Sequence, residues 1–193
     1  MDNIILIGGG GHCISCIDVI EAENKYKIVG ILDSKGKIGQ RVSGYEIIGS
    51  DDEISELTAY GNYFLITIGQ MTPHSKRDEI FFYLKKICAK IATVISPYAY
   101  VSHHAKVGIG TIVMHGVIIN AGANVGDNCI INSMALIEHE AFVKDNCHIS
   151  TGTVINGRAH IENNSFVGSH VTVVQNAVVK SGSFIKAHSL VVT

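Results

Sequence analysis

The part of this sequence best suited to chemistry is a histidine with a carboxylate beside it, His139–Glu140 in the segment Ile137–Glu138–His139–Glu140. A neutral imidazole accepts a proton near pH 7, and an adjacent carboxylate favours its protonated form. Such a pair can remove the proton of an amine or hydroxyl while that group attacks an acyl carbon. The pair predicts general-base catalysis by His139 with support from Glu140, and this chemistry needs no metal.

A glycine-rich loop near the N-terminus predicts a site for a phosphorylated ligand. Gly8–Gly11 and His12 follow the apolar run 3–7 and precede a stretch of helical periodicity. Glycines let backbone N–H groups approach phosphate or ribose, and a helix N-terminus favours negative charge. Cys13 stands where the dinucleotide fingerprint G-x-G-x-x-G requires glycine, so the pattern does not indicate an NAD site. A plain tight turn remains the alternative.

Two more segments should end beside this loop. Lys27–Asp33 predicts a second buried strand, and Tyr63–Gly69 predicts a third. Ligands of open α/β sheets bind at the carboxyl ends of the strands, so His12, Asp33 and Gly69 should converge there.

Helix signals separate these strands and complete an alternating pattern. The first helix should end near Asn24, and Ser50–Glu53 has the residues of a capping box that starts a short helix. Thr72–Pro73 predicts the start of another helix that runs to about Lys86. Alternating strands and helices predict a small, Rossmann-like parallel sheet over residues 1–94.

From residue 95 onward the sequence repeats every six residues. Each first position is Val or Ile, and each fifth position is a small residue or valine. The seventeen first positions are Ile95, Val101, Val107, Val113, Ile119, Val125, Ile131, Ile137, Val143, Ile149, Ile155, Ile161, Val167, Val173, Val179, Ile185 and Val191.

The period has a physical explanation. A fifth position and the next first position lie two residues apart, so both side chains face the same side of a short strand. The third and fourth positions carry turn residues. We expect a prism of short parallel strands over residues 95–193, with three strands per coil and residues 18 apart stacked on one another. His139 and Glu140 fall at a corner, where both side chains leave the core. A purely structural solenoid is the alternative.

The composition excludes several classes of protein. The formal net charge is −2, so a protein that binds the nucleic-acid backbone is not indicated. No apolar run approaches the length of a membrane span, and the N-terminus lacks the features of a signal peptide. Five cysteines without regular spacing suit reduced thiols in a cytoplasmic protein. Cys13 and Cys16 form a lone C-x-x-C, which we interpret as helix packing rather than a redox or metal site.

The order of these motifs resembles the sugar O/N-acetyltransferase family of hexapeptide-repeat acyltransferases. The resemblance covers the glycine loop, the Ile31–Asp33 strand end, the Ile68–Gly69 strand end and the hexads. It implies an α/β plus all-β protein, in which a Rossmann-like βαβ domain precedes a left-handed parallel β-helix. It also implies an acetyl-CoA-dependent enzyme that binds a nucleotide sugar in the first domain. As a homotrimer, it would bind acetyl-CoA between neighbouring subunits.

The resemblance also implies roles for individual residues. His139 would be the catalytic base, and His148 would contact acetyl-CoA from a strand face that points toward a neighbouring subunit. Acetyl-CoA would be bound by His148, Gly157, Ser169 and Ala187, and the substrate by Gly10, Gly11, His12, Asp33, Ser34 and Gly69.

Several alternatives stay open at this stage. Many family members have two consecutive acids where this chain has Asp33–Ser34, so the acceptor is expected to be either a UDP-4-amino sugar or the hydroxyl of a sialic-acid-like sugar. A non-catalytic sugar-nucleotide scaffold is a third reading, and His115 is a second candidate base. The sequence stops at the third position of a hexad, so we expect either a further closing tail beyond Thr193 or binding without that arm.

Overall fold

In the computed structural model, residues 1–71 and 75–192 are described. The first part is a sheet in the strand order β3-β4-β2-β1-β5-β6. Its elements are β1 (Asp2–Ile7), α1 (Gly11–Glu23), β2 (Tyr26–Leu32), η1 (Lys35–Lys37), β3 (Arg41–Val42), β4 (Tyr45–Gly49), η2 (Asp51–Glu53), α2 (Ile54–Ala59), β5 (Tyr63–Ile66), α3 (Lys76–Lys86) and β6 (Lys90–Ile91).

The sheet is parallel except at one edge, which differs from the prediction. β3 pairs antiparallel with β4 through a tight turn at Ser43 and Gly44, both of which have positive φ. Such a turn matches the twist of paired strands. The apolar residues of the hairpin, Val42, Tyr45, Ile47 and Ile48, are too few and too interrupted to form a long apolar run. Ser43–Gly44 is the sequence signal that would have revealed the turn.

Helix starts and strand ends follow local chemistry. Ser50 and Glu53 form the predicted capping box ahead of α2, and Ser75 and Asp78 form a second one ahead of α3. Thr72 and Pro73, the predicted start of that helix, lie outside the described residues. The third strand ends at Ile66 rather than Gly69, because the chain then leaves the sheet toward the second domain.

The β-helix consists of seventeen two-residue strands in three parallel sheets, and it starts at Val94. The first sheet contains β7 (Val94–Ile95), β10 (Ile112–Val113), β13 (Ile130–Ile131), β16 (His148–Ile149), β19 (Phe166–Val167) and β22 (Phe184–Ile185). The second contains β8 (Tyr100–Val101), β11 (Ile118–Ile119), β14 (Leu136–Ile137), β17 (Val154–Ile155), β20 (Thr172–Val173) and β23 (Leu190–Val191). The third contains β9 (Lys106–Val107), β12 (Asn124–Val125), β15 (Phe142–Val143), β18 (His160–Ile161) and β21 (Val178–Val179).

The predicted register is confirmed. Ile112 pairs with Ile130 and Ile118 with Leu136, so residues 18 apart stack from coil to coil. The helix is left-handed, as the resemblance implies. First and fifth positions face the interior, where Ile131, Ala135 and Ile137 are fully or almost fully buried. The narrow interior accounts for the small number of aromatic residues in this half of the chain.

The corners require an unusual backbone. Fourteen successive fourth positions have positive φ, and nine of these are Gly or Asn, the residues that tolerate the left-handed region best. The fourteen are Gly110, Gly116, Gly122, Asn128, Met134, Glu140, Asn146, Gly152, Arg158, Asn164, His170, Asn176, Gly182 and His188.

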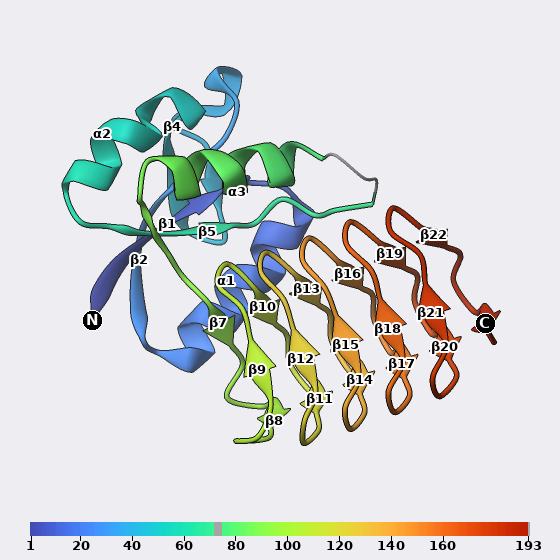
Figure 1. Cartoon of the computed structure of the whole chain (residues 1–193). Coiled ribbons are helices and arrows are strands. Elements are labelled where there is room, and N and C mark those ends of the chain that lie inside the picture. Colours follow the sequence, from blue (N-terminus) through green and yellow to red (C-terminus); the bar gives the residue numbers. More distant parts are fainter. Residues whose placement is uncertain (72–74, 193) are drawn as a thin grey trace.

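The two domains share a hydrophobic core. One face of the sheet packs with α2 and α3, and α1 lies between the other face and the β-helix (Figure 1). Cys13 and Cys16 are buried in α1 within this shared core, as the packing interpretation predicts, and burial raises the pKa of both thiols.

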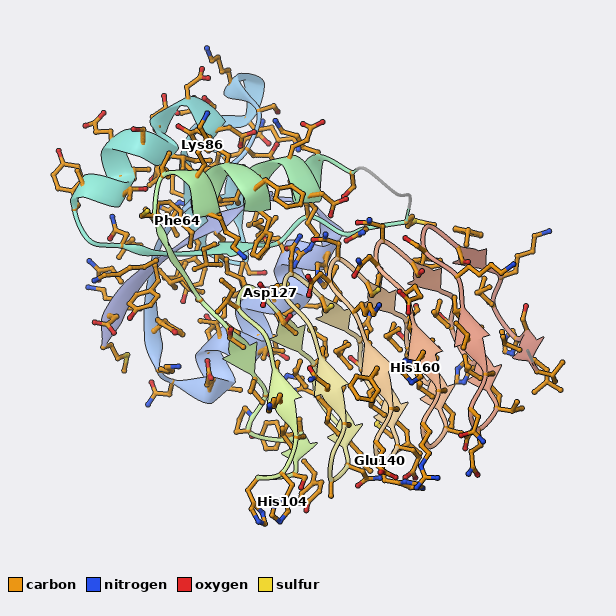
Figure 2. The ribbon with its side chains drawn as sticks, in the orientation of Figure 1. Phe64, Lys86, His104, Asp127, Glu140 and His160 are labelled. Carbon is orange, nitrogen blue, oxygen red and sulfur yellow. The ribbon has the colours of Figure 1, made fainter. Side chains whose placement is uncertain are left out.

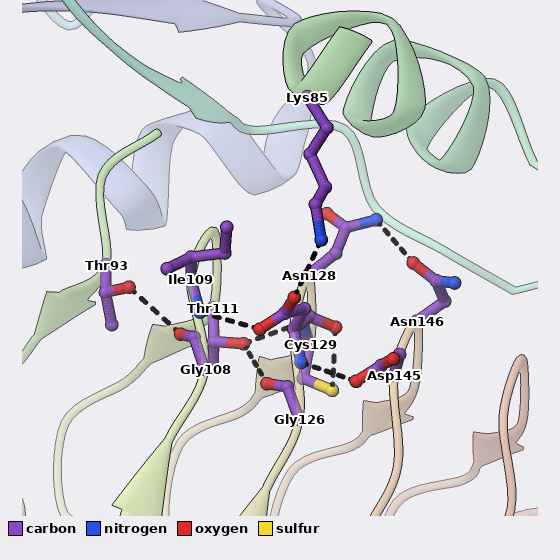
Figure 3. A network of polar contacts seen from close by, with 11 residues as sticks. Lys85, Thr93, Gly108, Ile109, Thr111, Gly126, Asn128, Cys129, Asp145 and Asn146 are labelled. Atoms are coloured by element: carbon purple, nitrogen blue, oxygen red, sulfur yellow. Dashed lines mark hydrogen bonds and ion pairs between the residues drawn. The ribbon is translucent and has the colours of Figure 1, made fainter. Parts of the chain in front are cut away.

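One corner of the β-helix lies under α3 and is cross-linked by polar groups (Figure 3). Asp127 accepts from the Ile109 N–H, its own N–H donates to Asp145, and it pairs with Lys85 of α3 at 3.3 Å. Asn128 donates to Asn146 on the next coil. This corner, between the third and first sheets, is therefore one attachment of the β-helix to the N-terminal domain.

Candidate active site

A cavity of about 680 Å³ opens at the carboxyl ends of β1, β2 and β5. Its lining includes all six residues predicted to bind the substrate, Gly10, Gly11, His12, Asp33, Ser34 and Gly69. The other lining residues are Gly8, Leu32, Lys35, Lys37, Ser50, Asp51, Asp52, Thr67, Ile68 and Lys76.

The glycine loop leaves the start of α1 open toward this cavity. A Cβ on Gly10 or Gly11 would meet no atom within 4 Å, whereas a Cβ on Gly8, which has a φ of +109°, would lie 2.4 Å from Ile68. Gly8 therefore shapes the turn, and Gly10 is the N-cap of α1. The first turn of α1 contains no acidic residue, so the positive end of the helix dipole is free to face an anionic ligand.

Asp33 supports the glycine loop. It accepts from the Gly9 N–H at 2.8 Å and the Ser34 N–H at 2.6 Å, and both oxygens lie 3.1 Å from Lys37 Nζ. Burial raises the pKa of Asp33, but the hydrogen bonds from Ser34, Lys37 and Gly9 outweigh it and hold the pKa below its usual value. Asp33 thus stays ionised and orders the loop around the cavity.

Three lysines around the cavity were missed by the sequence analysis. Lys35 pairs with Asp52 at 2.7 Å, Lys37 with Asp33, and Lys76 with Asp51 at 3.1 Å. Lys35 and Lys37 lie in η1, which closely follows the second strand, and Lys76 starts α3, so no single motif contains all three. Ammonium groups beside an open helix N-terminus suit a diphosphate.

His12 lies at the inner end of the cavity and is largely enclosed. Its Nε2 is buried and has no hydrogen-bond partner among the described residues. Burial, followed by the charges of Arg77 and His148, lowers the pKa of His12 to about 3. His12 is therefore a neutral ring near pH 7 whose free nitrogen can bond to a ligand.

His148 is buried, which corrects the expectation that it points toward a neighbouring subunit. It projects outward from the first sheet, but the loop after β5 covers it, and only 9% of the residue is exposed. Its Nδ1–H donates to the Gln70 carbonyl oxygen at 2.7 Å. Gln70 in turn donates to the Asn146 carbonyl. Burial lowers the pKa of His148 to about 4, against the effect of the Gln70 hydrogen bond.

Arg77 holds the same loop to the β-helix. This fully buried guanidinium donates to the carbonyls of Ile66 and Ile68 on one side and of Asn128 and Gly110 on the other. Burial lowers the pKa of Arg77 to about 10, so it remains charged at neutral pH. Its charge beside His12 and His148 favours the neutral form of both rings.

His139 and Glu140 lie at the corner between the second and third sheets, as predicted. Both side chains are about half exposed, and His139 Nδ1 is 3.5 Å from Glu140 Oε2. Glu140 lies at the edge of the β-helix remote from the N-terminal domain (Figure 2). No residue of this corner lines the cavity, so one chain does not bring the base and the cavity together.

Arg158, another residue that the sequence analysis missed, completes this corner. Its Nε donates to Glu140 Oε2 at 2.9 Å, and this hydrogen bond, with the charge of Arg158, lowers the pKa of Glu140. The signal that could have identified Arg158 is its spacing of 18 residues from Glu140, which places it one coil above.

Three predicted cofactor residues share one position in the repeat. Gly157, Ser169 and Ala187 are all third positions, and their backbone N–H groups donate no hydrogen bond to any described residue. Gly157 lies against the ring of His139, where a Cβ would be 2.6 Å from Nε2. Ser169 and Ala187 lie on a different corner, between the first and second sheets. Free N–H groups at corners suit the carbonyl oxygens of an extended acyl donor.

The second candidate base, His115, serves a structural contact. Its Nδ1 lies 2.6 Å from Ser96 Oγ and its Nε2 lies 2.8 Å from Asp18 Oδ2 of α1. Both ring nitrogens therefore have protein partners, and the ring links α1 to the β-helix.

Neither a metal centre nor a membrane span is found in the part of the chain that the structure describes. No group of three or more His, Cys, Asp or Glu side chains is placed there to hold a metal ion. Among the helices of residues 1–71 and 75–192, none is long and apolar enough to cross a membrane.

Comparison with known proteins confirms the resemblance to hexapeptide-repeat sugar acetyltransferases. Residues 3–82 match the family model of the PglD N-terminal domain. No match was found among curated protein sequences. The chain is similar to the acetyltransferase domain of PglB from Neisseria gonorrhoeae, with 26% identity and a TM-score of 0.91 over 100% of this chain and 92% of that one. That domain has also been solved in complex with acetyl coenzyme A.

Two further structures share the fold. PerB from Caulobacter crescentus, solved with CoA and GDP-perosamine, is 24% identical with a TM-score of 0.67 over 98% of this chain and 93% of that one. WeeI from Acinetobacter baumannii is 17% identical with a TM-score of 0.76 over 100% of this chain and 97% of that one.

Proposed function

We propose that this chain, which shares its whole architecture with the hexapeptide-repeat sugar acetyltransferases, transfers an acetyl group from acetyl-CoA to the amine of a UDP-4-amino sugar in bacterial glycan biosynthesis. The observation that carries this proposal is the pairing of two features in one fold. An open cavity at an α1 N-terminus suits a sugar nucleotide, and a histidine–glutamate pair on the β-helix suits a base. Residues 1–94 would hold the sugar nucleotide, and residues 95–193 the acyl donor.

In the proposed reaction, His139 acts as the general base. Its Nδ1 faces Glu140, which leaves Nε2 to accept the proton of the attacking amine. The amine nitrogen forms a bond to the thioester carbon as the carbon–sulfur bond breaks. The sulfur leaves with the bonding electron pair and receives the proton from His139. The N–H of Gly157, which lies next to the ring and donates to no described residue, would stabilise the carbonyl oxygen.

The complete site would form between two subunits of a homotrimer. The N-terminal domain covers the first coils of the first sheet but leaves Phe184 exposed. The outward side chains of the second sheet form a mostly apolar row that includes the exposed Tyr100, Ile118 and Leu190. Packing of three such faces around an axis would bury this row. It would also bring the His139 corner of one subunit toward the Ser169 corner and the cavity of the next. Such an enzyme would act in the cytoplasm, where acetyl-CoA is supplied.

One observation favours a second acceptor. Ser34 lines the cavity at the position where an acid would be placed to hold a sugar amine. The same base could act on a hydroxyl, so O-acetylation of a sialic-acid-like sugar is the alternative reaction.

The proposal is tested by CoA release over a panel of UDP-amino sugars, CMP-sialic acid and free sialic acids. Turnover with a UDP-4-amino sugar alone supports the first reaction, and turnover with a sialic acid alone supports the second. His139→Asn should lower kcat by about 10² to 10⁴ because the base is lost. The matched variant His103→Asn, at an exposed histidine two coils below His139, should keep the wild-type rate. Undiminished transfer by His139→Asn would refute the role of His139, and binding of acetyl-CoA without turnover on any acceptor would support a scaffold.

A further inference from the structure

The cationic side chain of Arg158 lies one coil above the proposed base. Its Nε donates to Glu140 Oε2 at 2.9 Å, and the same oxygen lies 3.5 Å from His139 Nδ1. The backbone N–H of Arg158 also donates to the His139 carbonyl oxygen at 3.1 Å. Arg158 therefore contacts both members of the pair, one through its side chain and the other through its main chain.

The backbone at this corner shows that these side chains are held at a conformational cost. Glu140 and Arg158 have φ values of +57° and +59°, in the left-handed region that Gly and Asn occupy at most other fourth positions. Two long charged residues stacked on successive coils at such positions are not required by the β-helix itself. Strained residues of this kind are found preferentially at functional sites.

Few charged groups surround His139. On its own coil, Glu138 accepts from the His139 N–H at 3.2 Å and from Asn120 Nδ2 at 3.0 Å, and Glu140 faces Nδ1. The coil below presents Ala121 and Gly122 at this corner, which do not titrate. The coil above presents Gly157 and Arg158. Arg158 is thus the cation that opposes the two carboxylates around the ring.

We propose that Arg158 is a positioning residue that holds the Glu140 carboxylate and limits how strongly it pairs with the His139 ring. This inference rests on the proposed function. A carboxylate shared with Arg158 orients the ring but attracts its proton less than a free carboxylate would. Without the guanidinium, Glu140 would pair more tightly with His139, and the loss of the positive charge would itself favour protonation.

The test compares Arg158→Gln, which keeps a hydrogen-bond donor without charge, with Arg158→Lys, which keeps the charge. For Arg158→Gln we expect the acidic limb of the kcat/KM profile to move to higher pH by about 0.2 to 0.7 units, with the alkaline plateau retained. Arg158→Lys should restore most of the wild-type profile. Lys144 forms a similar ion pair with Glu162, which lies one coil above it on another corner. Lys144→Gln removes that pair and should leave the kcat/KM profile unchanged.

A second measurement does not depend on turnover. NMR titration of the His139 ring in the substrate-free protein, assigned with His139→Asn, should show the same shift for Arg158→Gln. The ring would shift even if the acceptor or the reaction were different, so failure of this inference is distinguishable from failure of the proposed function. An unmoved titration refutes the inference. A raised KM for acetyl-CoA with an unmoved acidic limb also refutes the inference. That result would mean that Arg158 binds the acyl donor, in the cavity of about 500 Å³ that Arg158 and Glu140 line.

Discussion

At the scale of residues, the surroundings of the two histidines near the cavity keep both rings neutral. His12 and His148 are enclosed where the loop after β5 meets the β-helix, and the charge of Arg77 opposes their protonation. Nδ1 of His148 carries the hydrogen because its partner is the Gln70 carbonyl, which can only accept. Neither ring is therefore suited to be a base, and only the Nε2 of His12 lacks a protein partner among the described residues. This supports the proposal that the exposed His139 transfers the proton.

This burial predicts a loss of stability in mild acid. The pKa of His148 is lowered from 6.5 to about 4 in the folded protein. Between these two pH values the ring is protonated in the unfolded chain and neutral in the folded chain. Stability should therefore fall as the pH drops from about 6.5 toward 4, by roughly 3 kcal/mol for this group over the full window.

The measurement is urea unfolding of wild type and His148→Asn between pH 7 and 4. Asn offers an N–H toward Gln70 but does not titrate, so the variant should lose less stability in acid than wild type. His188→Asn, at an exposed ring, should follow the wild-type curve. Parallel curves for wild type and His148→Asn would contradict the burial of His148.

Sequence reasoning reached some of these residues and not others. The six predicted cavity residues follow from strand ends that meet at one sheet edge. The burial of His148 does not follow in the same way, because it depends on Gln70, a residue 78 positions earlier in the chain. In the sequence, Arg77 looks like an ordinary charged residue of a helix. Only the packing of the two domains shows that its partners are backbone carbonyls from both domains.

At the scale of elements, stacking between coils determines the geometry of the base. The sequence predicts the coils almost completely, since each first position is Val or Ile and residues 18 apart pair in register. It does not predict the β3–β4 hairpin, whose strands of two and five residues mix polar and apolar side chains. Gly157 lies one coil above His139, where a side chain would meet the His139 ring. The repeat therefore explains why a glycine suits this position.

Gly157→Ala should therefore impair the base without unfolding the coil. The added Cβ would lie 2.6 Å from Cε1 and Nε2 of His139, so the ring must move. We expect kcat to fall by about tenfold to a hundredfold, because misplacement of a catalytic group by about 1 Å has effects of this size. Steady-state kinetics, with circular dichroism as a check on folding, measures this.

Gln175→Ala is the matched control, since position 175 is the equivalent corner position one coil further on and already carries a side chain. It should retain the wild-type kcat. A wild-type kcat for Gly157→Ala would show that the position of the His139 ring does not matter for transfer.

At the scale of the whole molecule, the fold separates the two halves of the proposed site. The N-terminal domain attaches to the corner that contains Asp127 and to the corner that contains His115, and the proposed base lies on the third corner. The cavity and His139 therefore belong to different edges of one subunit. This separation and the apolar outer row of the second sheet are the observations that support the proposed site between two copies.

The most direct test of the account mixes two inactive variants. His139→Asn lacks the base but keeps the cavity. Gly10→Asp keeps the base and supplies a good N-cap for α1, but it puts a negative charge where the diphosphate should bind. Each variant alone should be inactive as a purified oligomer. Subunits of the two variants are then co-assembled in equal amounts and assayed for CoA release.

If each site takes its cavity from one subunit and His139 from the next, random co-assembly restores roughly one quarter of the wild-type activity, because one interface in four combines two intact halves. A mixture no more active than its parents would contradict the account, since it would place the base and the cavity of each site in the same chain.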